Sequence, residues 1–276
     1  MNNLLKRTVF GALYVAVIVT SLLFLRPYYF QLLFLVVSVL AVREYYHINH
    51  ADTLLTVCGM VLTWLMFLVA TTMWLTTFYS WWLILIALYG FVLILSLTAE
   101  LFKKAADPIR NWGLLLSGQV FVALPFSLMN PLFDRSPMLL LALFVIIWTN
   151  DTGAYCVGSL FGRHRMFVRV SPKKSWEGFA GGAVFAMLAG WIFFADPFGF
   201  TSLTYSWWKS LVLSLVIVIF GTLGDLTESL TKRTLGIKDS GNVIPGHGGW
   251  LDRFDSILLS TPALLLTLLL LEGLEN

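Results

Sequence analysis

The sequence predicts an all-α, polytopic helical membrane protein of about nine transmembrane helices, with its N-terminus in the cytoplasm. Of its 276 residues, 58% are hydrophobic and only 12% are charged. That is about half the charge of an ordinary soluble domain, and the mean hydropathy is +0.83. The apolar residues form continuous runs rather than alternating with polar ones, which favours membrane helices over barrel strands.

The apolar runs are each close to the length of about 20 residues that spans a bilayer. In chain order they are 8–25, 29–48, 54–75, 80–99, 112–130, 138–158, 178–195, 208–226 and 256–274. The first run is longer than the core of a signal peptide, so we expect a retained helix. No repeat or linker divides the chain. We therefore expect a single integral membrane domain over 1–276, with N-terminal helices in 1–130 and a catalytic half in 138–276.

Basic residues predict the orientation, because cytoplasmic loops are enriched in Lys and Arg. With the N-terminus in the cytoplasm, all but three of the 18 basic residues, Arg26, Arg135 and Lys209, fall on the cytoplasmic side. The long loops 159–177 and 227–255 fall there too, so we expect the chemistry on that face. The net charge of +3 is too small to suggest a nucleic-acid partner.

Two polar segments precede the most polar stretch of the chain. Asn150 and Asp151 interrupt an apolar run, so they should face a wet cavity or form a hydrogen-bonded pair between helices. Ser171 is predicted to cap the next helix, with Pro172 as its first residue. Lys173 and Lys174 would then lie at a helix start that attracts phosphate. The alternative is positive-inside charge beside anionic headgroups.

The most polar stretch runs from Gly224 to Ser256. If the eighth helix continues into it, Asp225, Glu228, Ser229 and Lys232 share one face, since they stand at i, i+3, i+4 and i+7. Such charged residues at a membrane boundary indicate a functional site.

Three carboxylates of this stretch could converge. Asp252 and Asp255 are predicted to share a face at the start of the ninth helix, opposite Asp225 on the eighth. Carboxylate oxygens are the ligands that Mg²⁺ prefers, with substrate phosphates completing its shell. The alternative is a salt-bridged loop in which nearby lysines and arginines neutralise the aspartates.

A glycine-rich loop connects the two helices. Gly248 and Gly249 permit tight turns and a close approach of the backbone to a ligand. His247 between glycines is more typical of a structural hydrogen bond than of a metal ligand. The chain has no Walker A loop and no G-x-G-x-x-G signature.

Four short segments of this stretch resemble the signature of phosphatidate cytidylyltransferases, also called CDP-diacylglycerol synthases. They are SLTKR from Ser229, KDSG from Lys238, PGHGG from Pro245 and DRFD from Asp252. The Asn150-Asp151 pair and the SPKKSWEG run also resemble the family. The N-terminal helices match it only in hydrophobic character.

The resemblance implies an enzyme of phospholipid biosynthesis that condenses CTP with phosphatidate to CDP-diacylglycerol and pyrophosphate. It implies Mg²⁺, in some members with K⁺, and a homodimer in a bacterial cytoplasmic (inner) membrane whose active site faces the cytoplasm. It places the metal on Asp225 and Asp252 and essential polar roles on Ser229 and Lys232. From the chemistry of the other residues we expect Asp255 beside the metal and catalytic roles for Asp151, Lys173 and Lys174, as well as for Ser229 and Lys232. Substrate contacts are expected from Lys238, Asp239, His247, Gly248, Gly249 and Arg253.

Other functions remain open on the sequence alone. A transporter also carries polar residues within membrane segments, although here they cluster toward one side. A cytidylyltransferase for another lipid phosphate would share the same motif, because lipid choice depends on apolar surfaces. An inactive scaffold is disfavoured by the intact set of acidic and basic residues.

Overall fold

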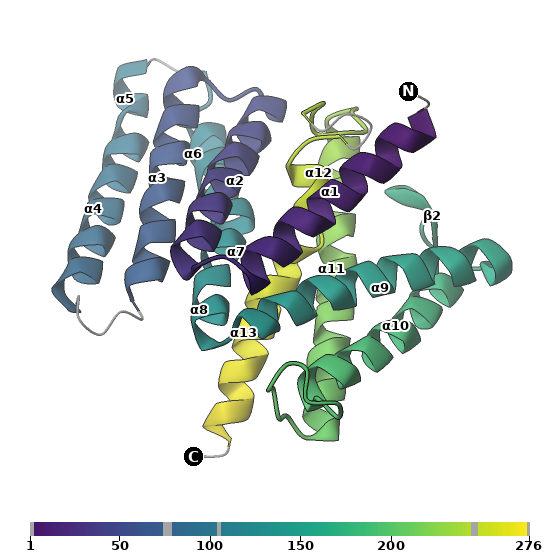
Figure 1. Ribbon diagram of the computed structural model, residues 1–276. Helices are drawn as coiled ribbons and strands as arrows, with labels where there is room; N and C mark the ends of the chain where they lie inside the picture. The colour runs from purple at the N-terminus through teal and green to yellow at the C-terminus, as the bar shows by residue number, and fades with distance from the viewer. Residues whose placement is uncertain (1–2, 74–78, 104–105, 244–247, 275–276) are drawn as a thin grey trace. The chain divides into compact units, whose positions relative to one another are not determined.

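The computed structural model describes residues 3–73, 79–103, 106–243 and 248–274, and helices dominate it (Figure 1). Its elements are α1 (Asn3–Leu23), α2 (Pro27–Ile48), α3 (Thr53–Thr72), α4 (Tyr79–Thr98), α5 (Glu100–Lys103), α6 (Pro108–Gly118), the π-helix η2 (Gln119–Ala123), α7 (Leu124–Ser127), α8 (Met129–Arg135), α9 (Pro137–Phe161), β1 (Arg165–Phe167), β2 (Ser171–Ser175), α10 (Trp176–Gly190), the π-helix η3 (Trp191–Ala195), α11 (Trp207–Thr234), α12 (Leu251–Phe254) and α13 (Ile257–Gly273).

The prediction of an all-α polytopic membrane protein is confirmed. Within the described ranges, eight helical segments are long and apolar enough to cross a membrane. The first expected span corresponds to a shorter apolar helix, Thr8–Leu23 within α1. Each of the other expected runs falls on one of the eight segments.

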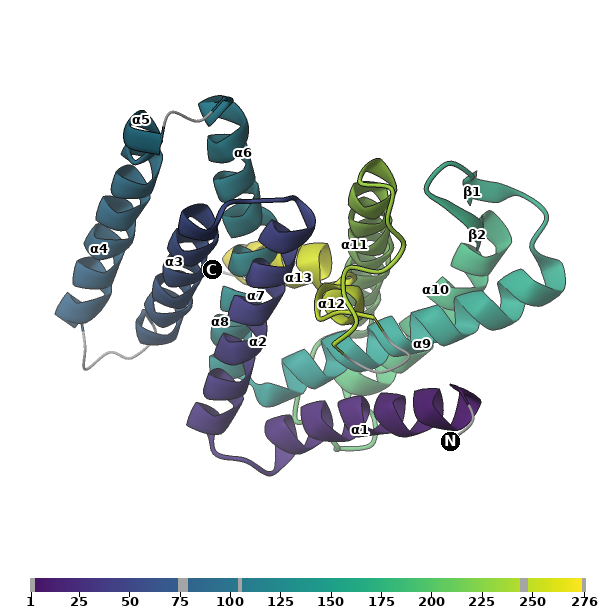
Figure 2. The same ribbon diagram turned by 90° about the horizontal axis from the view of Figure 1, so that it is seen from above.

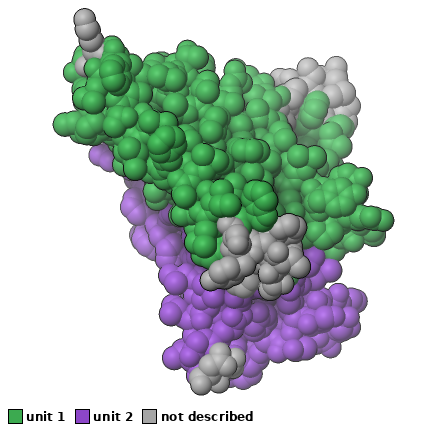
Figure 3. All heavy atoms as spheres, turned by 90° about the vertical axis from the view of Figure 1, so that its left-hand side faces the viewer, with its two compact units in different colours: residues 1–134, 239–254 green, residues 135–238, 255–276 purple. Residues whose placement is uncertain are grey.

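The chain divides into two compact units, which Figure 3 colours separately. Unit 1 comprises residues 1–134 and 239–254, and unit 2 comprises residues 135–238 and 255–276. The polar stretch is therefore shared between them. Residues 224–238 and 255–256 of this stretch belong to unit 2, and residues 239–254 belong to unit 1.

Unit 1 is organised around Tyr46. Helices α2, α3 and α4 lie side by side (Figures 1 and 2), and the fully buried Tyr46 ring fills the space left by two glycines. A Cβ at Gly59 would lie 2.1 Å from the Tyr46 ring, and one at Gly118 would lie 2.5 Å from the Tyr46 hydroxyl oxygen. The hydroxyl donates to the Leu115 carbonyl at 2.9 Å and accepts from Gln119 Nε2 at 3.1 Å. Small residues and interhelical hydrogen bonds of this kind hold membrane helices together.

Unit 2 is organised around the close pair α9 and α10, which lie side by side in both ribbon views. A Cβ at Gly178 would lie 2.8 Å from the Ala154 carbonyl oxygen. One at Gly182 would lie 2.6 Å from the Asn150 carbonyl oxygen. Glycines therefore let the two backbones approach, and α11 packs against both α10 and α13. This packing brings Asn150, on α9, next to α10.

The segment predicted to begin a helix at Ser171 is a strand instead. β2 pairs antiparallel with β1, and α10 begins after Ser175, whose Oγ accepts a hydrogen bond from the Gly178 N–H at 3.1 Å. The predicted cap at Ser171 and first helical residue at Pro172 are therefore wrong. Ser175 offers the same capping hydroxyl four residues later, and Glu177 follows in the first turn, where the helix dipole favours a carboxylate.

Asp196 organises the loop that precedes α11. It adopts a positive φ of 47°, and its carboxylate accepts hydrogen bonds from the N–H groups of Phe200, Thr201 and Ser202 at 2.6, 3.0 and 2.7 Å. Desolvation works to raise the pKa of Asp196, but these hydrogen bonds outweigh it and hold the pKa below its usual range.

Candidate functional site

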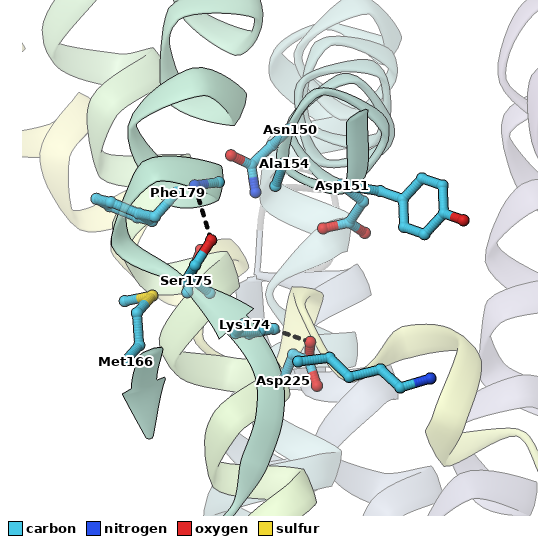
Figure 4. Close-up of a pocket in the computed structure, with 12 residues that line it drawn as sticks. Asn150, Asp151, Ala154, Met166, Lys174, Ser175, Phe179 and Asp225 are labelled. Carbon is cyan, nitrogen blue, oxygen red and sulfur yellow. Dashed lines mark hydrogen bonds and ion pairs between the residues drawn. The ribbon is translucent and has the colours of Figure 1, made fainter. Parts of the chain in front are cut away.

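Unit 2 contains a cavity of about 270 Å³ between α9, the β-hairpin, α10 and α11. Figure 4 shows Asn150 and Asp151 reaching it from α9, and Lys174 from β2 meeting Asp225 of α11. The full lining is Asn150, Asp151, Ala154, Tyr155, Met166, Lys173, Lys174, Ser175, Gly178, Phe179, Thr222 and Asp225. Four of the residues predicted from sequence, Asp151, Lys173, Lys174 and Asp225, thus line one cavity.

The central contact of this cavity is an ion pair. Lys174 Nζ lies 2.6 Å from Asp225 Oδ2, and both side chains are about three-quarters buried. Ser229, one turn along α11, donates a hydrogen bond to Asp225 Oδ1 at 3.2 Å. Both oxygens of Asp225 are therefore engaged. Partial burial makes such a pair stronger than an exposed one.

Asn150 offers a further polar atom beside the ion pair. The residue is 6% exposed, and its Oδ1 has no hydrogen-bond partner anywhere in the described chain. A buried polar atom without a partner costs free energy. Its position in the cavity wall makes it a candidate contact for a ligand.

The face predicted for the eighth helix is confirmed, because α11 continues to Thr234. Lys232 lies 2.5 Å from Glu228, one turn earlier, and both side chains are buried. Asp255 is close enough to Asp225 and Glu228 to interact with them electrostatically. Unit 2 thus gathers several carboxylates with Lys174 and Lys232 among them.

The ninth predicted helix, 256–274, corresponds to α13, which a turn separates from α12. α12 ends at Phe254, and Asp255 lies in the turn before α13. Asp252 and Asp255 are therefore not on one continuous helix, contrary to prediction. In this turn the N–H of Ser256 donates a hydrogen bond to Asp255 Oδ1 at 2.6 Å, which orients the Asp255 side chain.

Asp252 belongs to unit 1 and is held firmly there. It is 8% exposed, and its Oδ2 accepts hydrogen bonds from the N–H groups of Ser240 and Gly249, each at 2.8 Å. The Ser240 hydroxyl oxygen also lies 2.9 Å from this Asp252 oxygen. Ser240 and Gly249, both in the segment between α11 and α12, therefore contact this carboxylate. Convergence of Asp252 with Asp225 and Asp255 involves both units and stays a prediction.

The residues predicted to contact substrate are more scattered. Lys238 and Asp239 are exposed, and they belong to unit 2 and unit 1, respectively. Gly248 has a positive φ of 81° and packs on Asp252, since a Cβ there would lie 2.3 Å from Asp252 Oδ2. The carbonyl of Arg253 accepts a hydrogen bond from the Tyr14 hydroxyl at 3.1 Å. His247 lies outside the described residues.

The cavity residues fit a hard cation chemically, because Asp151 and Asp225 present carboxylate oxygens to one space. The described residues contain no group of three or more His, Cys, Asp or Glu side chains already placed to hold a metal ion. The assignment of Mg²⁺ to Asp225, Asp252 and Asp255 therefore stays a prediction.

Sequence reasoning missed one residue that contacts this loop, Glu44 on α2. Its carboxylate accepts hydrogen bonds from the N–H groups of Trp250 and Leu251 at 3.0 and 3.1 Å. A signal was present, since Glu44 is a carboxylate near the end of an apolar run. Because Arg43 precedes it, the two residues resemble the charged pair that commonly lies where a membrane helix reaches the aqueous phase.

Comparison with known proteins gives a consistent result. The model of the cytidylyltransferase family matches residues 5–271. The phosphatidate cytidylyltransferase of Staphylococcus epidermidis is 35% identical over 193 residues, which cover 69% of this chain and 72% of that protein. The protein of the same name from Bacillus subtilis is 36% identical over 177 residues, or 63% of this chain and 64% of the relative.

Other relatives align over a shorter region. The phosphatidate cytidylyltransferase of Staphylococcus saprophyticus is 41% identical over 129 residues, which are 47% of each chain. The relative from Staphylococcus haemolyticus is 43% identical over 131 residues, again 47% of each. This chain therefore spans about half the length of these two relatives.

Proposed function

This chain belongs to the cytidylyltransferase family, and on that premise we propose that it transfers a cytidylyl group from CTP to phosphatidate, yielding CDP-diacylglycerol and pyrophosphate. The observation that carries the proposal is the unit 2 cavity, where Lys173 and Lys174 stand beside Asp151 and Asp225. Cations beside carboxylates suit a site for phosphate groups and a divalent ion. The helical segments able to cross a membrane suit a lipid substrate.

The reaction needs positioning more than it needs a base. A phosphate oxygen of phosphatidate, already ionised near neutral pH, attacks the α-phosphorus of CTP as the bond to the pyrophosphate oxygen breaks. The main task is to bring two polyanions together in line and to stabilise charge on the leaving group. Lys173 and Lys174 would neutralise phosphates at the cavity, and Lys232 would do so at the end of α11. Asn150 Oδ1 and Asp151 would contact the nucleoside.

Asp225, Asp252 and Asp255 would hold Mg²⁺, which when bound supplies charge neutralisation for the phosphates. The residues fit this role in chemistry, since all three present carboxylate oxygens. Asp252 Oδ2 accepts from the N–H groups of Ser240 and Gly249, and these donors orient the side chain independently of any ion. A K⁺ ion, a homodimer and an inner-membrane location with a cytoplasmic active site belong to the same proposal.

The test is pyrophosphate release by the purified protein in detergent–phosphatidate micelles with Mg²⁺. CTP, ATP, GTP and UTP are offered separately, each with a no-lipid control. We expect release only with CTP and phosphatidate together. Release with CTP and an isoprenoid phosphate instead would overturn the lipid assignment, and no release from folded protein under any condition would overturn the proposal.

Two variants test the assignment of residues. Asp252→Asn keeps the shape of the side chain but removes its charge, so turnover should fall below detection. Arg165→Ala is the control, because Arg165 is exposed and its side chain donates to a backbone group, the Lys173 carbonyl, at 3.0 Å. Its activity should change less than about threefold. Turnover by folded Asp252→Asn near that of the unmodified protein would refute the metal assignment.

A further inference from the structure

Glu44 is a buried carboxylate that contacts the segment leading into Asp252. It lies near the end of α2 and is 9% exposed. Its Oε2 accepts from the Trp250 N–H at 3.0 Å, and its Oε1 accepts from the Leu251 N–H at 3.1 Å and from the Ser240 hydroxyl. Burial of a carboxylate is costly unless donors satisfy it. These three donors lie 196, 206 and 207 residues along the chain from Glu44.

Two glycines of the segment between α11 and α12 give room to the Glu44 carboxylate. A Cβ at Gly249 would lie 2.0 Å from Glu44 Oε1, and one at Gly241 would lie 3.0 Å from Oε2. Gly249 has no positive φ that would require glycine on conformational grounds. Its need for glycine therefore arises from Glu44. This differs from the sequence-based interpretation, in which Gly249 let the backbone approach a nucleotide.

Ser240 connects Glu44 to Asp252. Its hydroxyl contacts Glu44 Oε1 and lies 2.9 Å from Asp252 Oδ2, and its N–H donates to the same Asp252 oxygen at 2.8 Å. Gly249, packed on Glu44, donates its N–H to Asp252 Oδ2 as well. Two of the groups that fix Asp252 are therefore themselves fixed by Glu44.

We propose that Glu44 is a positioning residue: it anchors Ser240 and the segment from Gly249 through Leu251, and so fixes the carboxylate of Asp252. The proposal rests on the proposed function for the role of Asp252 in turnover, but the anchoring itself does not depend on that role. Outer partners of a metal ligand typically change metal affinity or activity by about 10- to 100-fold when removed. Glu44 is expected to act within this range.

The first test compares Glu44→Gln with Glu100→Gln in the full-length protein in detergent. An amide at position 44 keeps one acceptor oxygen but turns an NH₂ group toward a donor of the loop. Glu100 is the matched control, because it is a buried glutamate of the same unit that pairs with Lys103 at 2.7 Å. Amide hydrogen exchange is measured in peptides covering 239–252, and activity is titrated with Mg²⁺.

We expect Glu44→Gln to speed exchange of these peptides by about tenfold or more. We also expect it to raise the Mg²⁺ concentration for half-maximal activity by about 10-fold or more. Glu100→Gln should change neither measurement. General destabilisation would lower the active fraction in both variants without moving the Mg²⁺ midpoint. Equal exchange in the two variants would overturn the anchoring whether or not the protein proves to be a cytidylyltransferase.

The second test is a double-mutant cycle with Gly249→Ala. Alone, this methyl group collides with the Glu44 carboxylate, so exchange in 239–252 should rise about tenfold as in Glu44→Gln. In a Glu44→Ala background the collision is gone, and adding Gly249→Ala should raise exchange less than about twofold. An effect of equal size in both backgrounds would show that Gly249 is needed for another reason and would overturn this step.

Discussion

Gly182→Ala tests the close packing of α9 against α10 that forms one wall of the cavity. The new methyl group would lie 2.6 Å from the Asn150 carbonyl oxygen and 2.8 Å from Asn150 Oδ1. The nearest atom is backbone, so relief requires the helices to move apart, and overpacking of this kind costs up to about 3 kcal/mol. The higher helix propensity of Ala returns about 1 kcal/mol. The net loss of stability is therefore about 2 kcal/mol.

The measurement is thermal unfolding of the purified protein in detergent, where this loss should lower Tm by about 4 to 8 °C. Gly90→Ala in α4 is the matched control, since nothing lies within 4 Å of a Cβ there. It keeps the propensity gain without the collision, so its Tm should stay unchanged or rise. A Tm for Gly182→Ala equal to that of Gly90→Ala would refute the claim that glycine is needed for helix contact.

Two further predictions concern charged groups. Lys174→Met leaves Asp225 without its ion-pair partner, so kcat/KM for CTP should fall by about 10- to 100-fold, with partial recovery in Lys174→Arg; full activity in Lys174→Met would contradict the role of this pair. The pKa of Asp196 is lower in the folded protein than in the unfolded chain. The Asp196 carboxylate therefore stabilises the fold at any pH above its unfolded-state pKa of about 3.9, and this stabilisation is lost as the pH falls through its folded-state pKa. Hydrogen-exchange protection of the loop after Asp196 should therefore be lower at pH 3 than at pH 5. The variant Asp196→Asn should show the same low protection at both pH values. Equal protection of this loop at pH 3 and pH 5 in the unmodified protein would contradict the prediction.

The helices could be predicted from sequence because lipid imposes a simple rule on them. Each long apolar run must satisfy its own backbone hydrogen bonds, so it becomes a helix. The spacing of Asp225, Ser229 and Lys232 then fixed their common face on α11, because helical periodicity decides which side chains align. These features depend on local sequence alone.

The β-hairpin could not be predicted in this way. Ser171 and Ser175 are both good caps, and both are followed by residues that a first turn accepts. The strand that begins at Ser171 depends on pairing with β1, and a cap pattern carries no information about a strand partner. Lys174 consequently reaches Asp225 from a strand, although sequence placed it at a helix start.

Glu44 shows why part of the candidate site could not be predicted from sequence: its role depends on tertiary contacts. In sequence it is one carboxylate in a helix that resembles the family only in hydrophobicity, far from the glycine-rich loop. In the structure its carboxylate meets Ser240, and Gly249 gives it room. The glycines of a binding motif are commonly assigned to a ligand, but here Gly248 faces the carboxylate of Asp252 and Gly249 faces that of Glu44. A motif therefore marks where backbones approach closely, and only the contacts decide whether the partner is a ligand or another part of the protein.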